Sequence, residues 1–272
     1  MKSATTWLSE CLRAHPEIFM SDIKEIHYFS NHYEKGIEWY LKNFEKASTE
    51  KAIGEFCITY MDRPEIAERI LKDLGRIKVL INLRNPVERF HSHVKHQLRI
   101  SDLSSDIANS KLSLENYNML TEKYPKLLSK GLYYEDVKNY SSLFGKENVL
   151  VTFKDDIDSN PKAVISQVYE FLGVNPSFEP SMLEKAVSPG TIPKYKALES
   201  FRVATYSLVR NTFPKAITWV RKYRLAEAYR KLNSSNQELT FSDEVVNELK
   251  QFYKEDISSL ESFLDVNLNH WK

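Results

Sequence analysis

The chain has 272 residues, in which 38 Lys and Arg balance 37 Asp and Glu to a formal net charge of +1. This length can bury a full core, as one large domain or two small ones. The balanced charge provides no overall field of the kind that attracts nucleic acid, so we expect no nucleic acid partner.

Membrane and export signals are absent from the sequence as it stands. No apolar run approaches the ~20 residues that cross a bilayer, and Lys2 is followed by polar residues rather than the apolar core of a signal peptide. Cys11 and Cys57 form neither a disulfide framework nor a zinc pattern, which suits a reducing compartment. We therefore expect a cytoplasmic protein, an expectation that a segment upstream of Met1 would change.

The first eight residues combine a cation, hydroxyl side chains and the start of a helix. Lys2, Ser3, Thr5 and Thr6 come first, and Leu8, Cys11 and Leu12 follow at helical spacing. A helix start offers unpaired N–H groups and a positive dipole end, which together bind an anion. The stretch outlines a phosphate-binding loop, although an ordinary capped helix is the simpler explanation of these residues taken alone.

Helix and strand then alternate as far as residue 173. The pattern predicts helices at 5–15, 36–44, 64–74, 86–99, 133–144 and 161–172, and extended segments at 24–29, 52–59, 77–83 and 148–153. Residues 101–113 and 187–196 are expected to be loops, and helices continue to the end, the last over 242–264. This alternation predicts an α/β fold with a parallel sheet flanked by helices.

A cation stands at the end of the strand predicted over 77–83. A phosphate-loop kinase or ATPase should place an Asp there to hold Mg²⁺, whereas this chain has Arg84. Ser92 follows about two helical turns later. The two side chains suit a second anion site without metal, and the alternative is an Arg at a sheet edge with a solvated Ser.

Two proton acceptors, Glu25 and His27, share one face of the segment predicted to be extended at 24–29. They suit general base catalysis, and the alternative is a surface pair. His91, His93 and His96 lack the i, i+4 spacing of zinc helices, and no acid or Cys completes a set, so we expect no metal site. A serine nucleophile motif of the G-x-S-x-G type is absent.

Three segments in this order resemble the sulfotransferases that use 3′-phosphoadenosine 5′-phosphosulfate (PAPS). They are Lys2-Ser-Ala-Thr-Thr-Trp-Leu8, Lys24-Glu-Ile-His-Tyr-Phe29 and Leu83-Arg-Asn-Pro-Val-Glu-Arg-Phe-His-Ser92. The likeness is nearest to the heparan-sulfate and related carbohydrate branch. Later stretches agree, namely Gly131-Leu-Tyr-Tyr134, Phe144 with Asn148-Val-Leu-Val151, Phe171-Leu-Gly173 and a closing helix over 260–271.

The resemblance covers nearly the whole chain, and its first and third segments are specific only in combination. It implies a P-loop-like three-layer fold in a single domain over 1–272, with an α/β core at 1–173 and a cofactor loop and helices at 174–272. It also implies sulfuryl transfer from PAPS, without metal, to an acceptor hydroxyl that is expected to belong to a glycan.

The resemblance also implies roles for individual residues. The loop that holds the phosphosulfate corresponds to Lys2, Ser3, Ala4, Thr5, Thr6 and Trp7, with Lys2 also neutralising the leaving group. Arg84 and Ser92 correspond to the pair that holds the 3′-phosphate, and Lys194 and Tyr195 to the loop that closes over the cofactor. Glu25 corresponds to the general base with His27 beside it, and Glu55 and His27 to acceptor contacts.

Three positions depart from the family pattern. Ala4 replaces a Gly, which is costly if the backbone there needs a positive φ. Cys57-Ile58 replaces a Ser-Pro or Thr-Pro pair, and no Gly-rich cofactor loop is recognisable near the C-terminus. A nucleotide kinase with a degenerate loop and a non-catalytic relative that only binds nucleotide therefore stay open as alternatives.

Residues 201–232 are strongly basic. Eight cations stand against Glu227 as the lone acid, interleaved with aromatic residues: Arg202, Arg210, Lys215, Arg221, Lys222, Arg224, Arg230 and Lys231. A solvated helix pair explains them, and the functional alternative is contact with an anionic glycan or membrane surface.

The beginning of the chain is unusual for a phosphate-binding loop. Such a loop normally follows a buried central strand, and nothing precedes Met1 in this sequence. We therefore expect that the first central strand is missing, that 77–83 and 148–153 flank a gap, and that these residues alone are poorly stable and nearly inactive. The melting temperatures of the chain with and without upstream residues test this expectation.

Overall fold

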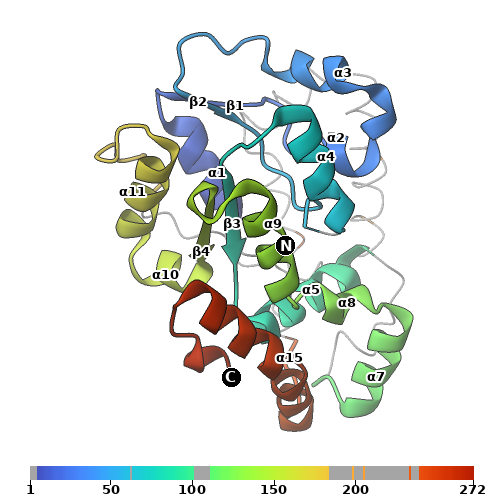
Figure 1. Ribbon diagram of the computed structural model, residues 1–272. Coiled ribbons are helices and arrows are strands. Elements are labelled where there is room, and N and C mark those ends of the chain that lie inside the picture. Colours follow the sequence, from blue (N-terminus) through green and yellow to red (C-terminus); the bar gives the residue numbers. More distant parts are fainter. Residues whose placement is uncertain are drawn as a thin grey trace. The chain divides into compact units, whose positions relative to one another are not determined.

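The computed structural model describes residues 5–61, 63–100, 111–183 and 239–272, together with Leu198, Thr205 and Asn233. Its helices are α1 (Thr5–Ala14), α2 (Tyr28–Asn31), α3 (Ile37–Leu41), α4 (Pro64–Leu74), α5 (Pro86–Ile100), α7 (Leu114–Lys123), α8 (Lys126–Ser129), α9 (Tyr134–Phe144), α10 (Lys154–Ser159), α11 (Pro161–Leu172) and α15 (Asp243–Leu264). The strands are β1 (Ile18–Met20), β2 (Ala52–Gly54), β3 (Val79–Leu83) and β4 (Val149–Phe153) (Figure 1).

The chain divides into two compact units. The first comprises residues 1–89, 129–187 and 250–272, and the second comprises 90–128 and 188–249. All four strands belong to the first unit. The expected single domain over 1–272 stays a prediction.

The strands form two parallel pairs, β1 with β2 and β3 with β4. In the longer pair, Val79 lies opposite Val149 and Leu83 lies opposite Phe153. The expectation that these two segments flank a gap is therefore wrong, because β3 and β4 are direct hydrogen-bonded neighbours. Sequence order does not reveal which strands are adjacent, and among the described residues no strand joins the two pairs.

Helix α1 supplies the core that both strand pairs share. Its buried face carries Trp7, Leu8, Cys11 and Leu12, the i, i+3, i+4 pattern of the sequence. These residues belong to one cluster with residues of β1, α10 and α11, against which Ala52 of β2, Leu80 of β3 and Leu150 of β4 also pack. The beginning of α1 is thus held in place by apolar packing one turn further along the helix.

The other face of the β3–β4 pair is covered by α9 and by the C-terminal turn. Side chains alternate along a strand, so Ile81, Leu83 and Phe153 point away from the α1 cluster. There the Phe153 ring lies 5.5 Å from the ring of Trp271, which is fully buried. Figure 1 shows α11 and α9 on either side of this pair, which is the three-layer α/β arrangement expected from the sequence.

Several predicted boundaries are confirmed by local chemistry. Pro64 occupies the first turn of α4, and α11 begins where the Asn160 side chain accepts a hydrogen bond from the Ala163 backbone N–H. Helix α11 ends at Gly173, which adopts a left-handed conformation with φ 79°.

Three predicted elements are corrected. The segment 24–29 is not extended, because Glu25 and His27 have φ values of 59° and 58° and α2 begins at Tyr28. The strand expected over 52–59 ends at Gly54. The last helix expected over 242–264 is confirmed as α15, but the closing helix expected over 260–271 is not continuous, because a separate 3-10 turn forms at Asn269–Trp271. In the first two cases, contacts between the two segments replace the regular strand geometry that their composition suggested.

The second unit has its own apolar packing. Leu112 forms an isolated parallel bridge with Phe241, and the Phe241 ring lies 5.8 Å from that of Phe90. His91 Nε2 is 2.6 Å from the Leu239 carbonyl oxygen, which gives this histidine a structural partner. The segments 184–197 and 206–232, which include Lys194, Tyr195 and most of the basic stretch, lie outside the described residues.

Candidate active site

The start of α1 adjoins the segment that carries Glu25 and His27. Thr5 is the first residue of the helix, and the Lys24 ammonium donates to Thr6 Oγ1 at 3.2 Å. The same ammonium lies 5.4 Å from the centroid of the Phe56 ring. The Lys24 ammonium group therefore lies beside the N-terminus of α1, whose unpaired N–H groups already favour an anion.

The other residues of the expected phosphate loop have different positions. Lys2, Ser3 and Ala4 lie outside the described residues. Trp7 is 3% exposed, and its Nε1 donates to the Leu183 carbonyl oxygen at 3.4 Å. Its side chain is part of the core, so contact with an anion at the helix start would use its backbone N–H.

Glu25 and His27 lie side by side on a sharp turn. Glu25 Oε2 is 3.6 Å from His27 Nε2, with side-chain exposures of 29% and 22%. A flat strand would also place them on one face, but here the left-handed backbone at both residues brings the side chains together. The pair is partly open to solvent, as a base that meets an external hydroxyl must be.

The far side of the His27 ring is held by small polar side chains. His27 Nδ1 is 3.0 Å from Thr59 Oγ1 and 3.4 Å from Cys57 Sγ, and Ser30 Oγ is 2.8 Å from Thr59 Oγ1. If the Thr59 hydroxyl donates to Nδ1, the proton of a neutral ring sits on Nε2 and faces Glu25. Burial raises the pKa of the Cys57 thiol to about 11, so this sulfur is a neutral neighbour at physiological pH.

Helix α4 fixes the backbone that follows His27. Arg69 donates to the Phe29 carbonyl oxygen at 2.9 Å and Arg63 to the Ser30 carbonyl oxygen at 2.8 Å. These bonds satisfy carbonyl groups at the end of the short helix α2. The Tyr28 and Tyr33 hydroxyls both donate to the Asp73 carboxylate, each at 3.1 Å.

Glu55 lies beneath the same turn. Its Oε2 accepts from the Ile26 backbone N–H at 3.3 Å, and its Oε1 accepts from the Tyr60 hydroxyl at 2.6 Å. Burial raises the pKa of this carboxyl above its usual range, although the hydrogen bonds from Tyr60 and Tyr40 oppose that shift. Each oxygen accepts a hydrogen bond within the protein, and the contact between Glu55 and the acceptor that the resemblance implied stays a prediction.

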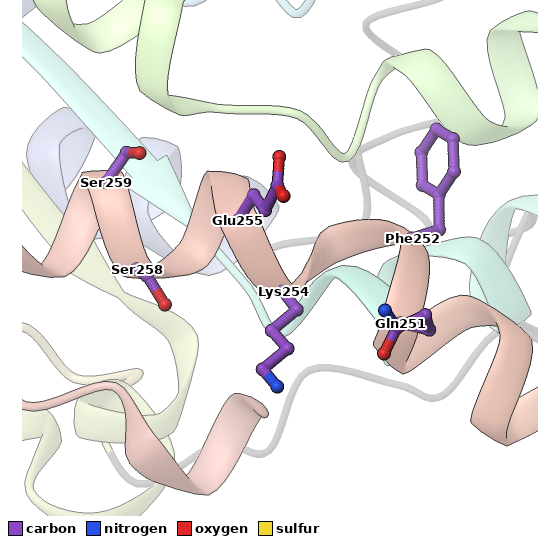
Figure 2. Close-up of a pocket in the computed structure, with 6 residues that line it drawn as sticks. All are labelled: Gln251, Phe252, Lys254, Glu255, Ser258 and Ser259. Atoms are coloured by element: carbon purple, nitrogen blue, oxygen red, sulfur yellow. The ribbon is translucent and has the colours of Figure 1, made fainter.

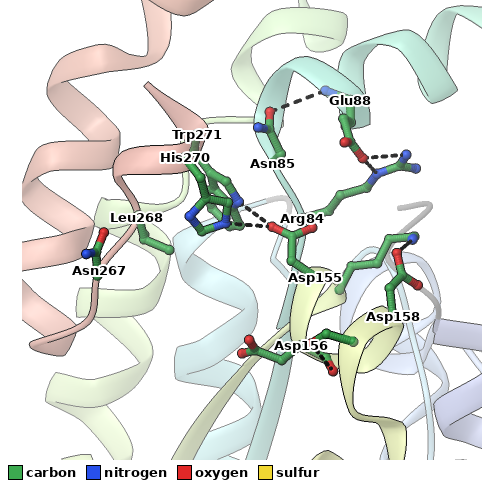
Figure 3. A network of polar contacts seen from close by, with 12 residues as sticks. Arg84, Asn85, Glu88, Asp155, Asp156, Asp158, Asn267, Leu268, His270 and Trp271 are labelled. Carbon is green, nitrogen blue, oxygen red and sulfur yellow. Dashed lines mark hydrogen bonds and ion pairs between the residues drawn. The ribbon is translucent and has the colours of Figure 1, made fainter.

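Arg84 stands directly after β3, as expected, and Figure 3 shows its neighbourhood. Its Nε and a terminal nitrogen bond Glu88 Oε2 at 2.9 and 2.8 Å, and its carbonyl oxygen accepts from the Tyr133 hydroxyl at 2.9 Å. Ser92 lies on α5 in the second unit and is half-buried.

Near the C-terminus, Trp271 lies beside Tyr133, whose hydroxyl donates to the Arg84 carbonyl oxygen. Asp155 Oδ2 accepts from Trp271 Nε1 at 2.5 Å and lies 3.0 Å from His270 Nε2 (Figure 3). The Trp271 ring lies 6.5 Å from that of Tyr133. The chain end therefore helps to fix the tyrosine that holds the Arg84 backbone.

A surface pocket lies elsewhere, along α15 (Figure 2). It is lined by Gln251, Phe252, Lys254, Glu255, Ser258 and Ser259, all from that one helix. None of the expected site residues lines it. A concavity built from one helix does not bring together polar groups from different elements, so we assign it no chemistry.

Comparisons with known proteins identify the family and the fold of the chain. The model of one family, described as the sulfotransferase domain, matches residues 1–261. The chain belongs to the sulfotransferase domain family. A crystal structure of a sulfotransferase from Alicyclobacillus acidocaldarius shares the fold, with a TM-score of 0.67 at 22% identity over 99% of this chain and 94% of that one.

Curated relatives of this sulfotransferase-family chain match a smaller share of it at somewhat higher identity. Membrane-associated sulfotransferase kil1 of Dictyostelium discoideum is 26% identical, over 64% of this chain and 55% of that protein. Heparan sulfate glucosamine 3-O-sulfotransferase 5 of Homo sapiens is 29% identical, over 64% of this chain and 51% of that protein. The chain thus spans about half the length of these relatives.

The described residues of the chain contain neither a candidate metal site nor a candidate membrane span. No group of three or more His, Cys, Asp or Glu side chains is placed to hold a metal ion there. No helix in that part of the chain combines the length and apolar character needed to cross a bilayer.

The sequence reasoning missed three neighbours of the expected site, namely Lys24, Thr59 and Glu88. Lys24 is the first residue of the Lys-Glu-Ile-His motif, and its position next to Glu25 could have identified it from the sequence. Glu88 is four residues after Arg84, the spacing of a helical ion pair. Thr59 had no signal, because only the folded chain brings it to His27.

Proposed function

We propose that this chain transfers a sulfuryl group from PAPS to a hydroxyl group of a carbohydrate acceptor. The observation that carries the proposal is the contact between Lys24 and Thr6. It joins an anion-binding helix start to the turn that bears Glu25 and His27, within one unit of the fold. Family membership supports the reaction class, and the heparan sulfate relatives support the acceptor class.

The donor's phosphosulfate would be held by Lys2, Ser3, Ala4, Thr5, Thr6 and the Trp7 backbone, with Lys24 as an additional cation. The residues present fit such a group, because Thr5 begins a ten-residue helix and a lysine ammonium lies at its first turn. When bound, PAPS supplies the sulfuryl group and a phosphate leaving group. Lys2 and Lys24 stabilise negative charge that develops at that phosphate.

Arg84 and Ser92 are proposed to bind the 3′-phosphate that distinguishes PAPS from ordinary adenine nucleotides. A guanidinium group donates two parallel hydrogen bonds to a phosphate, which gives both affinity and orientation. Lys194 and Tyr195, which lie outside the described residues, are proposed to contact the donor. No metal is needed, since cations of the chain occupy the role that Mg²⁺ has in kinases.

Glu25 is proposed as the general base in an in-line transfer. A carboxylate within about 3 Å of the acceptor hydroxyl can take its proton as the new bond forms. His27, 3.6 Å from Glu25 Oε2, orients that carboxylate and contacts the acceptor. Positioning and charge stabilisation then supply most of the rate, as in phosphoryl transfer.

Binding of adenosine 3′,5′-bisphosphate and of ATP, each without magnesium, tests the proposal by thermal shift. At a hundredfold excess over its Kd, a ligand adds about 2.7 kcal/mol of stability, which for a domain of this size is a rise in Tm of roughly 5–10 °C. We expect that rise for the bisphosphate and little change for ATP. Stabilisation by ATP only with Mg²⁺ would instead indicate a nucleotide kinase.

Transfer is measured with PAPS labelled in the sulfuryl group and a panel of glycans that includes heparan sulfate. Labelled glycan is the expected product. Binding of the bisphosphate without transfer to any hydroxyl acceptor would indicate a relative that only binds nucleotide.

A further inference from the structure

The turn that presents Glu25 and His27 is held in an uncommon conformation. Both residues have left-handed backbone angles, which non-glycine residues seldom adopt. Such a conformation persists only where surrounding contacts hold it. Contacts to the backbone of Glu25, Ile26 and His27 are therefore needed to hold the turn.

The contacts that hold the turn come from the segment after β2. The Ile26 backbone N–H, between the two left-handed residues, donates to Glu55 Oε2 at 3.3 Å. The Glu25 backbone N–H donates to the Phe56 carbonyl oxygen at 3.0 Å. Ile26 is 4% exposed, so its N–H has no access to water that would replace a lost partner.

The Glu55 carboxyl group is itself fixed from the opposite side. Its other oxygen accepts from the Tyr60 hydroxyl at 2.6 Å, and the Tyr60 carbonyl oxygen accepts from the Tyr140 hydroxyl at 2.6 Å. Tyr140 lies on α9 and is 4% exposed, so this chain of bonds is anchored in the core of the first unit. The Glu55 carboxyl group thus connects the turn at Ile26 to helix α9 through Tyr60.

We infer that Glu55 is a positioning residue, which holds the Ile26 N–H so that Glu25 and His27 face the acceptor together. This inference rests on the proposed function. It replaces direct contact between Glu55 and the acceptor by an action through the backbone. Loss of the bond lets the turn relax toward ordinary backbone angles and moves the Glu25 carboxylate, and a misplacement of about 1 Å costs a reaction roughly a hundredfold in rate.

The test compares Glu55→Leu with Tyr60→Phe. Leucine accepts no hydrogen bond, so it removes the partner of the Ile26 N–H, whereas a glutamine can keep its oxygen toward Ile26 and donate from its NH₂ group to the Tyr60 hydroxyl. Tyr60→Phe removes the bond to Oε1 and leaves the Ile26 bond in place, which makes it a matched control for any general loss of stability. For each variant, kcat, the KM for the acceptor, the Kd for adenosine 3′,5′-bisphosphate and Tm are measured.

For Glu55→Leu we expect kcat to fall about a hundredfold, with the bisphosphate Kd and the acceptor KM changed less than about threefold. Tyr60→Phe should keep kcat within about fivefold of the parent protein at a similar loss of Tm. An equal fall in kcat for both variants would overturn the inference. A raised acceptor KM with unchanged kcat for Glu55→Leu would also overturn it, since that result indicates direct contact with the acceptor.

Amide hydrogen exchange provides a readout that does not depend on activity. The Ile26 amide should be protected in the parent protein and in Tyr60→Phe, and should exchange at least tenfold faster in Glu55→Leu. Unchanged exchange at Ile26 in Glu55→Leu would refute the anchoring role. If the parent protein transfers no sulfuryl group, the proposed function fails while this measurement still decides whether Glu55 holds the turn.

Discussion

Replacing Arg84 with Ala should weaken adenosine 3′,5′-bisphosphate binding far more than AMP binding. A charge-assisted hydrogen bond contributes about 1.5–3 kcal/mol, which corresponds to a loss of roughly 10- to 150-fold in Kd. AMP lacks the 3′-phosphate, so its Kd should change less than about twofold. The Arg84 carbonyl oxygen that bonds Tyr133 is backbone and remains in the variant.

Glu88 competes with the 3′-phosphate for the Arg84 guanidinium group, but its ion pair contributes less free energy than the expected phosphate contact. Arg84 and Glu88 form an i, i+4 ion pair (Figure 3). The Glu88 side chain is 52% exposed and that of Arg84 is 18% exposed, and surface helical pairs contribute about 0.3–0.5 kcal/mol. That is several times less than the expected phosphate contact. Glu88→Gln should therefore tighten bisphosphate binding by only about twofold.

Isothermal titration calorimetry at low and physiological salt measures these constants. Arg84→Lys serves as the matched control, because it keeps the charge and loses the planar fork, and its Kd should fall between those of the parent protein and Arg84→Ala. Equal losses for the bisphosphate and AMP would refute the assignment of Arg84 to the 3′-phosphate. A Glu88→Gln variant that binds the bisphosphate more weakly would show that Glu88 orients Arg84 instead of competing for it.

Three further predictions concern the base, the core and the basic segment. Glu25→Gln should lower turnover by about 10²- to 10⁴-fold with unchanged bisphosphate binding, and a larger loss in His27→Ala than in Glu25→Gln would reassign the base. Gly131→Ala places a Cβ 2.7 Å from the Tyr253 ring, which is 0% exposed, so it should cost about 1–3 kcal/mol in chemical denaturation. Gly54→Ala, which meets nothing within 4 Å, is its control, and equal losses would contradict the packing argument. Affinity of the basic stretch at 201–232 for heparin or anionic vesicles should fall steeply with salt, and no binding at low salt would leave a solvated helix pair as its explanation.

The amino-acid sequence alone determined the elements with strong periodicity and clear end signals. Helices α4 and α11 begin at Pro64 and Pro161 and end before Gly75 and Gly173, as predicted, because capping and backbone restriction act over a few neighbouring residues. The order of three short segments also sufficed to identify the sulfotransferase resemblance. The β-branched run over 77–83 placed Arg84 at the end of a strand.

Tertiary structure decided how those elements meet. Whether β3 pairs with β4 depends on which surfaces pack best across the whole chain, and no local pattern encodes that choice. The segment 24–29 has the composition of a strand, yet Glu25 and His27 are left-handed. The Glu55 carboxyl group accepts from the Ile26 N–H and the Phe56 carbonyl oxygen accepts from the Glu25 N–H, and these bonds hold the turn. Hydrogen bonds between residues about thirty positions apart outweigh a β propensity that spans only ~1 kcal/mol, so the geometry around Glu25 became visible only in the folded chain.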